Sequence, residues 1–269
     1  YTVCFKLKYM INFKRKQNRS EKNSAKIFMK AIQELRKKTS KYYRTDHTDK
    51  QTKEEILEFQ QAQTILEEKV RQDDIKNNFM SFVKAMWPEF IEGKHHKEIA
   101  EKFNKIAQGK SKRLIINMPP RHTKSEFASF LLPAWMVGRK PDLKIIQTTH
   151  TTELALRFGR KAKTLIDSPE YQKIFQTRLR EDSQAAGKWE TEQGGEYYAA
   201  GVGSAITGRG ADLLIIDDPH SEQDALNPEA LEKAYDWYTS GPRQRLQPGG
   251  AIVVVMTRWS LKDLTGALL

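Results

Sequence analysis

A polar loop in the middle of the chain, residues 119–125, places a lysine next to a serine. An apolar, strand-like run precedes this loop and a helical pattern follows it. In the pattern G-x-x-x-x-G-K-[ST], the lysine reaches the β- and γ-phosphates of a nucleotide and the hydroxyl binds Mg²⁺. Lys124 and Ser125 fill the last two positions, but Met118 and Thr123 stand in place of both glycines. The loop favours phosphate binding, and the alternative is an ordinary Lys-Ser pair at a helix N-terminus.

Two adjacent aspartates, Asp217 and Asp218, end the apolar run 213–216. Neighbouring like charges repel each other, so such a pair at the end of a buried strand is costly unless it has a function. If this strand lies beside the strand before the loop, Asp217 comes near Ser125 and can hold a magnesium shell. Asp218 can then position or activate an attacking water. Together with Lys124, these carboxylates predict a nucleotide site, whereas a plain Asp-Asp-Pro turn is the alternative.

A third apolar run, residues 251–256, also ends in polar residues. From a neighbouring strand end, Thr257 can sense whether a γ-phosphate is present, and Arg258 can bind phosphate or DNA. Taken alone, the pattern is more typical of a plain strand end.

A fourth candidate is Arg209, which lies between Gly208 and Gly210 just before the run that leads to Asp217. The two glycines free the backbone and expose the guanidinium, which is a fixed and always charged partner for phosphate. Presented across a subunit boundary, it would act as an arginine finger. A surface hairpin is the alternative.

Strands and helices must bring these residues together. Short apolar runs rich in β-branched residues predict strands at residues 114–118, 144–149, 213–216 and 251–256. Helical patterns at 124–137 and 153–166 separate the first strands, which favours a parallel sheet covered on both faces. Ligands of such sheets bind beyond the carboxyl ends of the strands, which is where the candidate residues stand.

The N-terminal region differs from the rest in charge. Residues 1–50 hold 15 Lys and Arg against 4 Asp and Glu, while the remaining residues hold 31 against 30. We therefore expect residues 1–75 to form a basic, largely helical or partly disordered extension, and residues 76–269 to form a separate domain. A basic arm attracts polyanions, and a solvated leader is the alternative. Within and beyond the extension, helices are expected near residues 25–38, 54–71, 79–86 and 95–107.

Composition excludes several classes of protein. The longest apolar run spans six residues, 251–256, far below the roughly 18 that cross a bilayer, so no membrane partner is expected. The single cysteine, Cys4, excludes a disulfide scaffold and a cysteine-based zinc site. The chain opens with Tyr1 and has no signal peptide, so we expect a fragment of an intracellular protein.

In this order, the motifs resemble the large terminase subunit of tailed bacteriophages, the ATPase that drives DNA into capsids. The resemblance runs from about Phe79 to the end of the chain. It rests on INMPPRHTKS (116–125), PAW (133–135), TGRGAD (207–212), IIDDP (215–219) and MTRW (256–259).

The resemblance implies an α/β P-loop NTPase fold of the ASCE type, with a mostly parallel sheet flanked by helices, after a helical basic N-terminal extension. ATP and Mg²⁺ are the implied cofactors. Residues implied to contact the nucleotide are Pro120, Arg121, His122, Thr123, Lys124 and Ser125. Ser125 and Asp217 would bind the metal, and Asp218 takes the place of the catalytic carboxylate. Thr257 falls in the motif that couples hydrolysis to movement, and Arg209 is the candidate finger for a neighbour's nucleotide.

Partners also follow from the resemblance. They are double-stranded DNA, a homo-oligomeric ring that is pentameric in the family, the small terminase subunit and the portal protein, all in the cytoplasm of the host cell. Such proteins carry a C-terminal nuclease domain, which has no room here, so a C-terminally truncated ATPase domain is expected.

Two positions depart from the family pattern. Glycine usually stands at the position of Thr123, because it adopts positive φ easily and a β-branched residue does not. The loop therefore either follows another path or binds nucleotide more weakly. Many relatives have glutamate where this chain has Asp218, and aspartate is one methylene shorter than glutamate.

Two other functions remain open. A basic nucleic-acid-binding protein with a degenerate, purely structural loop would explain the missing glycines. A helicase-like DNA translocase would keep the ATPase and change the partner.

Overall fold

The computed structural model describes residues 50–269. The chain divides into two compact units, Tyr1–Asp73 and Asp74–Leu269. Helix α3 (Lys50–Asn77) supplies the described part of the first unit and contains the helix expected at residues 54–71. The basic arm and the helix expected near residues 25–38 lie outside the described residues. No helix within the described part is both long and apolar enough to cross a bilayer.

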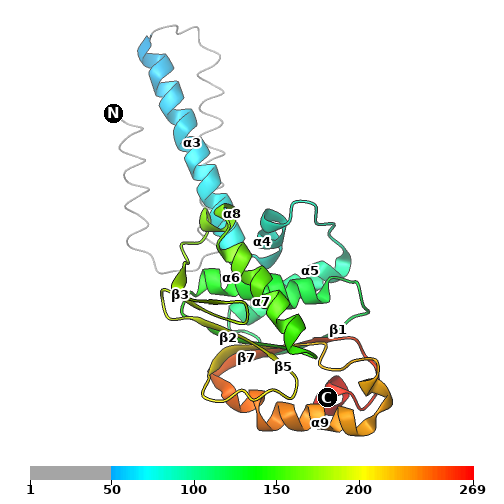
Figure 1. The fold of residues 1–269 in the computed structure, drawn as a ribbon. Coiled ribbons are helices and arrows are strands. Elements are labelled where there is room, and N and C mark those ends of the chain that lie inside the picture. Colours follow the sequence, from blue (N-terminus) through cyan, green and yellow to red (C-terminus); the bar gives the residue numbers. More distant parts are fainter. Residues whose placement is uncertain (1–49) are drawn as a thin grey trace. The chain divides into compact units, whose positions relative to one another are not determined.

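The second unit is built on one seven-stranded sheet, in the order β1-β7-β6-β2-β5-β4-β3 (Figure 1). The strands are β1 (Arg113–Asn117), β2 (Lys144–Thr149), β3 (Leu179–Ala185), β4 (Lys188–Thr191), β5 (Glu196–Gly201), β6 (Ala211–Asp217) and β7 (Leu246–Met256). The first five in this order pair in parallel, and β4 and β3 add an antiparallel edge. The expected mostly parallel α/β fold is confirmed.

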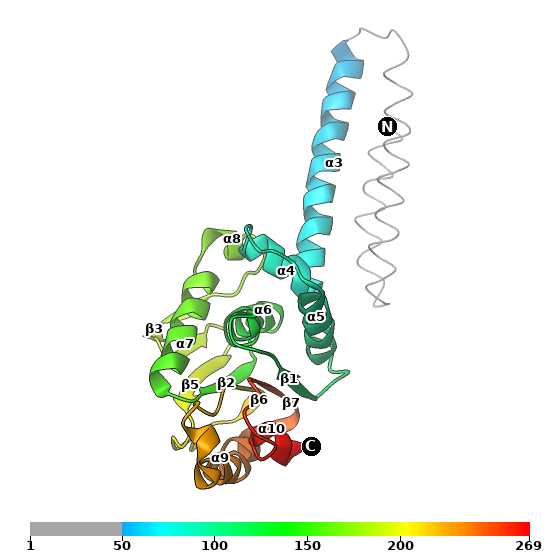
Figure 2. The same ribbon diagram turned by 90° about the vertical axis from the view of Figure 1, so that its right-hand side faces the viewer.

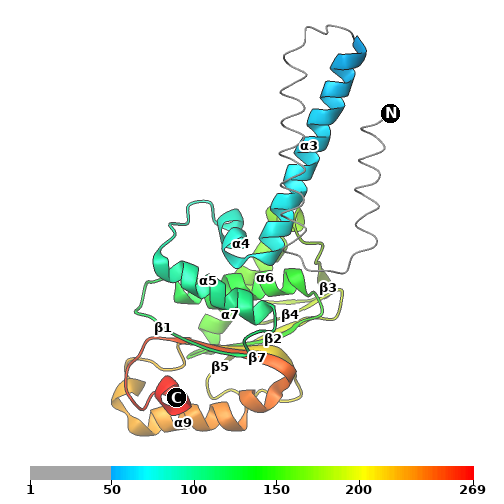
Figure 3. The same ribbon diagram turned by 180° about the vertical axis from the view of Figure 1, so that it is seen from behind.

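Helices cover both faces of the sheet, as Figures 1 and 2 show. One face carries α4 (Phe79–Met86), α5 (Lys94–Ala107), π-helix η1 (Glu126–Leu131), α6 (Leu132–Arg139), α7 (Thr152–Ile166) and α8 (Pro169–Gln172). The other carries α9 (Pro228–Ser240) and α10 (Leu264–Leu268), with the short 3₁₀ turns η2 (Asp224–Leu226) and η3 (Pro242–Arg245) in the same stretch of chain. Figure 3 shows the same layers from behind. The helices expected at residues 79–86 and 95–107 are confirmed.

The central strands are buried on both faces because their residues alternate between two hydrophobic cores. Leu213 and Ile215 of β6 pack into the core under α4–α7. Leu214 and Ile216 of the same strand pack into the core under α9 and α10. This alternation explains why the strand reads as a continuous apolar run in the sequence.

Three strands were not expected from the sequence. The strands β3 and β4 carry charged residues, and β5 contains two tyrosines and a glutamate rather than a β-branched run. Their pairing partners, above all β2 beside β5, make them strands. Propensity alone could not identify them, because pairing and burial override it.

Candidate active site

Parallel register aligns the carboxyl ends of three neighbouring strands. Asn117, which ends β1, pairs with Met256 at the end of β7. Asp217, which ends β6, pairs with Val255 of β7. The residues that follow these strand ends therefore emerge along one edge of the sheet. They are the 119–125 loop, Asp218 and Thr257.

The lysine-serine pair and the aspartate pair meet at this edge. The Ser125 hydroxyl donates a hydrogen bond of 2.9 Å to Oδ1 of Asp217. The Lys124 ammonium lies 2.8 Å from Oδ2 of Asp218, and the Lys124 side chain is only 6% exposed. Residues 92 and 94 positions apart in the sequence thus form two direct contacts. A buried ammonium without this carboxylate would be costly, which keeps the pair together in the absence of a ligand.

Asp217 is held by a second hydroxyl that the sequence motifs did not reveal. Ser129 donates a 2.6 Å hydrogen bond to Oδ2 of Asp217 and accepts one of 2.8 Å from Gln147 on β2. Burial raises the pKa of Asp217 to about 7; the charge of Asp218 adds to this rise, and the Ser129 and Ser125 hydroxyls oppose it. A serine four positions after Ser125 was the available signal, since such residues share a helix face. Ser129 lies in the π-helix η1, a feature common at functional sites.

Three residues of the site have left-handed backbone conformations. Arg121 has φ of 63°, Thr123 of 61° and Asp218 of 41°. Thr123 therefore adopts the positive φ for which glycine is normally needed. Weaker nucleotide binding, one of the two expected outcomes, stays a prediction. His122 and Pro120 close the turn, with 2.9 Å between Nδ1 of the histidine and the proline carbonyl.

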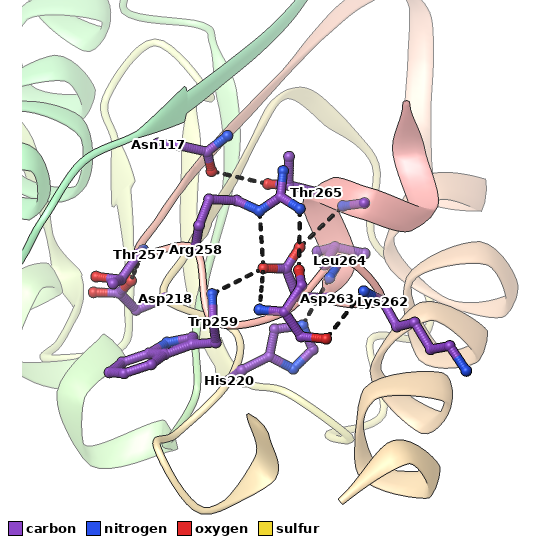
Figure 4. Close-up of polar contacts among 12 residues, drawn as sticks. Asn117, Asp218, His220, Thr257, Arg258, Trp259, Lys262, Asp263, Leu264 and Thr265 are labelled. Carbon is purple, nitrogen blue, oxygen red and sulfur yellow. Dashed lines mark hydrogen bonds and ion pairs between the residues drawn. The ribbon is translucent and has the colours of Figure 1, made fainter. Parts of the chain in front are cut away.

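Thr257 joins the end of β7 to the aspartate pair. Its backbone N–H donates a 2.8 Å hydrogen bond to Oδ1 of Asp218, as Figure 4 shows. Its hydroxyl is 3.4 Å from the carbonyl of Met118, at the entrance of the 119–125 loop. Thr257 thus contacts the segments that follow β1 and β6. A displacement of either segment would change one of these two contacts.

The residues after Thr257 fold around a fully buried carboxylate, Asp263 (Figure 4). Arg258 donates to its Oδ2 at 3.0 Å, so this arginine is engaged inside the chain. Backbone N–H groups also donate to Asp263, from Trp259, Ser260 and Gly266. Burial would raise the pKa of Asp263, but these N–H donors and the Arg258 charge outweigh it and lower the pKa.

Helix α10 forms hydrogen bonds to Asn117 at the end of β1 and to His220 shortly after the end of β6 (Figure 4). The N–H of Leu264 donates to Nε2 of His220, two residues after Asp218, at 2.9 Å. The Thr265 hydroxyl donates to the side-chain oxygen of Asn117 at 3.0 Å. Burial lowers the pKa of His220, which favours the neutral ring that this hydrogen bond needs.

Arg209 is not part of this cluster. It precedes β6, so it lies at the amino end of the strand, about 20 Å from Asp217 for a strand of this length. There it forms an ion pair with Glu196 and lies over the ring of Tyr198, 4.2 Å from its centroid. The residue cannot serve a ligand of its own chain at the carboxyl edge, and a role toward a neighbour's nucleotide stays a prediction.

The arrangement suits a phosphorylated ligand with a divalent cation. The Ser125 and Asp217 oxygens are the hard ligands that Mg²⁺ prefers, and such sites are completed by water and substrate phosphates. Residues 50–269 contain no group of three or more His, Cys, Asp or Glu that could hold a metal by themselves. Lys124 supplies the compensating charge for phosphate, and the helical segment that starts there offers free backbone N–H groups.

Comparisons with known proteins support the fold. No model of a protein family matches the chain, and no curated protein matches it. Among solved structures, that of the HK97 bacteriophage large terminase is similar, with a TM-score of 0.50 and 15% sequence identity. The match covers 72% of this chain and 40% of that protein, so the chain spans less than half the terminase's length. The fold is therefore terminase-like.

Proposed function

We propose that the chain binds ATP with Mg²⁺ at the carboxyl edge of β1, β6 and β7 and hydrolyses it. One observation carries the proposal: the Lys124-Ser125 pair contacts the Asp217-Asp218 pair directly, at 2.8 Å and 2.9 Å. An ammonium, a hydroxyl and two carboxylates are the groups that phosphoryl transfer requires for charge compensation, metal binding and water activation. The terminase-like fold adds support.

Each residue has a separate task in this proposal. MgATP supplies the γ-phosphoryl group, whose charge the metal partly neutralises. Lys124 exchanges Asp218 for phosphate oxygens, because the phosphates offer more negative charge than one carboxylate. Asp218 is then free to accept a proton from the attacking water. Ser125 and Asp217 hold the metal, and residues 120–123 surround the phosphates.

We further propose that this ATPase serves DNA packaging by a tailed bacteriophage. In this proposal residues 76–269 are the motor domain, the basic extension 1–75 contacts double-stranded DNA, and Thr257 relays the loss of the γ-phosphate. Arg209 of a neighbouring copy in a ring completes the site. The small terminase subunit and the portal protein are the proposed partners, in the host cytoplasm.

The test is ATP hydrolysis, with and without DNA, by the wild type, Lys124→Ala and Asp217→Ala. Both variants should lose at least about 100-fold in turnover. Lys124→Ala removes the charge that compensates the phosphates, and Asp217→Ala removes a residue proposed to hold the metal. The exposed Lys173→Ala and Asp142→Ala are matched controls and should behave like the wild type. Wild-type turnover in either site variant would refute the assignment.

A basic DNA-binding protein with an inactive loop is the rival function, and the strained Thr123 is the observation that favours it. It predicts salt-sensitive DNA binding without nucleotide binding. Titration with a fluorescent ATP analogue separates the two functions. Magnesium-dependent binding at micromolar concentration would exclude the rival, and its absence would exclude the ATPase.

A further inference from the structure

Thr123 holds a backbone conformation that its own side chain opposes. Its φ is 61°, in the left-handed region, where a β-branched residue is a genuine outlier. Such a conformation persists only where surrounding contacts fix it. Thr123 directly precedes Lys124, so any relaxation of its backbone would turn the lysine and serine away from the aspartates.

A chain of three hydrogen bonds runs from Gly93 through His96 and the Thr123 hydroxyl to the carbonyl of His122. The backbone N–H of Gly93 donates to Nδ1 of His96 at 2.8 Å. Nε2 of His96 lies 2.6 Å from Oγ1 of Thr123. Oγ1 in turn donates to the carbonyl of His122 at 2.6 Å.

These contacts fix the protonation of the His96 ring. Nδ1 accepts a hydrogen bond and so carries no proton, which leaves the proton of the neutral ring on Nε2. The Thr123 hydroxyl uses its only proton on His122, so it must accept from Nε2. The tautomer and the hydroxyl direction thus agree, and every donor in the chain has an acceptor.

His96 is itself held rigidly. Its side chain is 6% exposed and packs against both Phe90 and Phe127, with ring centroids 4.8 Å and 5.1 Å away. Phe127 belongs to the helical segment that follows the 119–125 loop. Burial, and then the neighbouring His95, lower the pKa of His96, which favours the neutral form that the hydrogen bonds require.

We propose that His96 is a positioning residue for the 119–125 loop and does the work that glycine does in other loops of this kind. By donating to Thr123, it fixes the threonine rotamer and, through it, the left-handed backbone that aims Lys124 and Ser125. In this proposal it acts through Thr123 and not by contact with the nucleotide. We call the hydrogen bond from His96 to the Thr123 hydroxyl the brace. The proposal rests on the proposed function only for the effect of the brace on nucleotide binding, because the brace itself involves no ligand.

A purely structural histidine is the simpler explanation, because His96 also caps α5 through Gly93. A double-mutant cycle distinguishes the two. Thr123→Gly removes both the strain and the hydroxyl, so the brace becomes unnecessary. If His96 acts through Thr123, replacing His96 should harm the wild-type loop and leave the glycine loop almost unaffected.

The experiment measures the affinity of a fluorescent ATP analogue with Mg²⁺ for the full chain. His96→Ala should weaken binding about tenfold in the wild-type background, and the affinity of Thr123→Gly is the reference for the second background. The double variant should bind within about twofold of Thr123→Gly. His96→Asn is the control for the helix cap, because its side-chain oxygen can take the place of Nδ1 and accept from Gly93. The shorter side chain has no atom that reaches Thr123, so this variant should bind the analogue as weakly as His96→Ala.

The same variants are unfolded in urea without nucleotide or metal. His96→Ala should lower the unfolding midpoint of the wild type more than that of Thr123→Gly. This measurement separates the two proposals: if the wild type binds no nucleotide but this difference appears, the proposed function fails and the brace stands. If His96→Ala costs the same in both backgrounds, in binding or in urea, His96 is only a helix cap and the inference is wrong.

Discussion

Replacing Asp217 by asparagine should stabilise the chain in the absence of ligand. Asp217 is 1% exposed, and its pKa rises from 3.8 to about 7. Each tenfold change in proton affinity corresponds to about 1.4 kcal/mol. The raised pKa therefore sets an upper limit of about 4 kcal/mol on the cost of ionising Asp217 in the folded chain above pH 7. Asparagine has the same shape and no charge, so this cost disappears.

The hydrogen bonds of the site can adapt to the amide. Ser125 keeps an oxygen acceptor, while the new amide can donate to Ser129. The Ser129 proton can then turn to Oε1 of Gln147, provided that this amide rotates. That oxygen is buried and makes no hydrogen bond within the described part of the chain. The rotation leaves the amide nitrogen of Gln147 unpaired in place of its oxygen, so the number of unpaired groups does not rise.

The sign of the pH dependence follows from the raised pKa. Between pH 4 and 7 the folded state binds the Asp217 proton more tightly than the unfolded state, so the wild type loses stability as the pH rises. The advantage of Asp217→Asn should grow by about 2–3 kcal/mol from pH 5 to pH 8. Urea unfolding at several pH values, with a chelator and no nucleotide, measures it. Asp142→Asn, at an exposed position, is the control.

Two outcomes would refute this reasoning. If Asp217→Asn were less stable than the wild type at pH 8, the carboxylate would not be the costly group that its burial indicates. If the difference in the free energy of unfolding were constant from pH 5 to pH 8, the pKa of Asp217 would be unperturbed. In either case, the cost of holding a bare carboxylate ready for a metal would not exist in this protein.

Two further predictions concern other parts of the chain. Asp263→Ala leaves three backbone N–H groups and Arg258 without their buried acceptor, so the free energy of unfolding should fall by about 3–5 kcal/mol in urea; an unchanged midpoint would contradict the role of this carboxylate. Deleting residues 1–50, which carry most of the excess positive charge, should flatten the dependence of DNA affinity on salt concentration, because fewer counterions are released. An unchanged slope would assign this arm to another task.

Local sequence was sufficient for the main strands and for the polar ends of two of them. The runs that end in Ile216 and Met256 are apolar on both faces, so they had to be buried strands. Parallel strands share one carboxyl edge, so the Lys124-Ser125 pair and the Asp217-Asp218 pair were expected to converge there. This inference needs only the periodicity of the strands and the helices between them.

The partners of these residues depended on the tertiary structure. Ser129 reaches Asp217 because a π-helix follows the loop, and His96 reaches Thr123 from a separate helix, 27 positions earlier. Asp263 becomes an acceptor for Arg258 only when the chain turns back on itself, and Arg209 falls at the opposite end of its strand from Asp217. A sequence records which groups could ionise or donate. Whether each is buried, charged or paired depends on neighbours that only folding brings within hydrogen-bond distance.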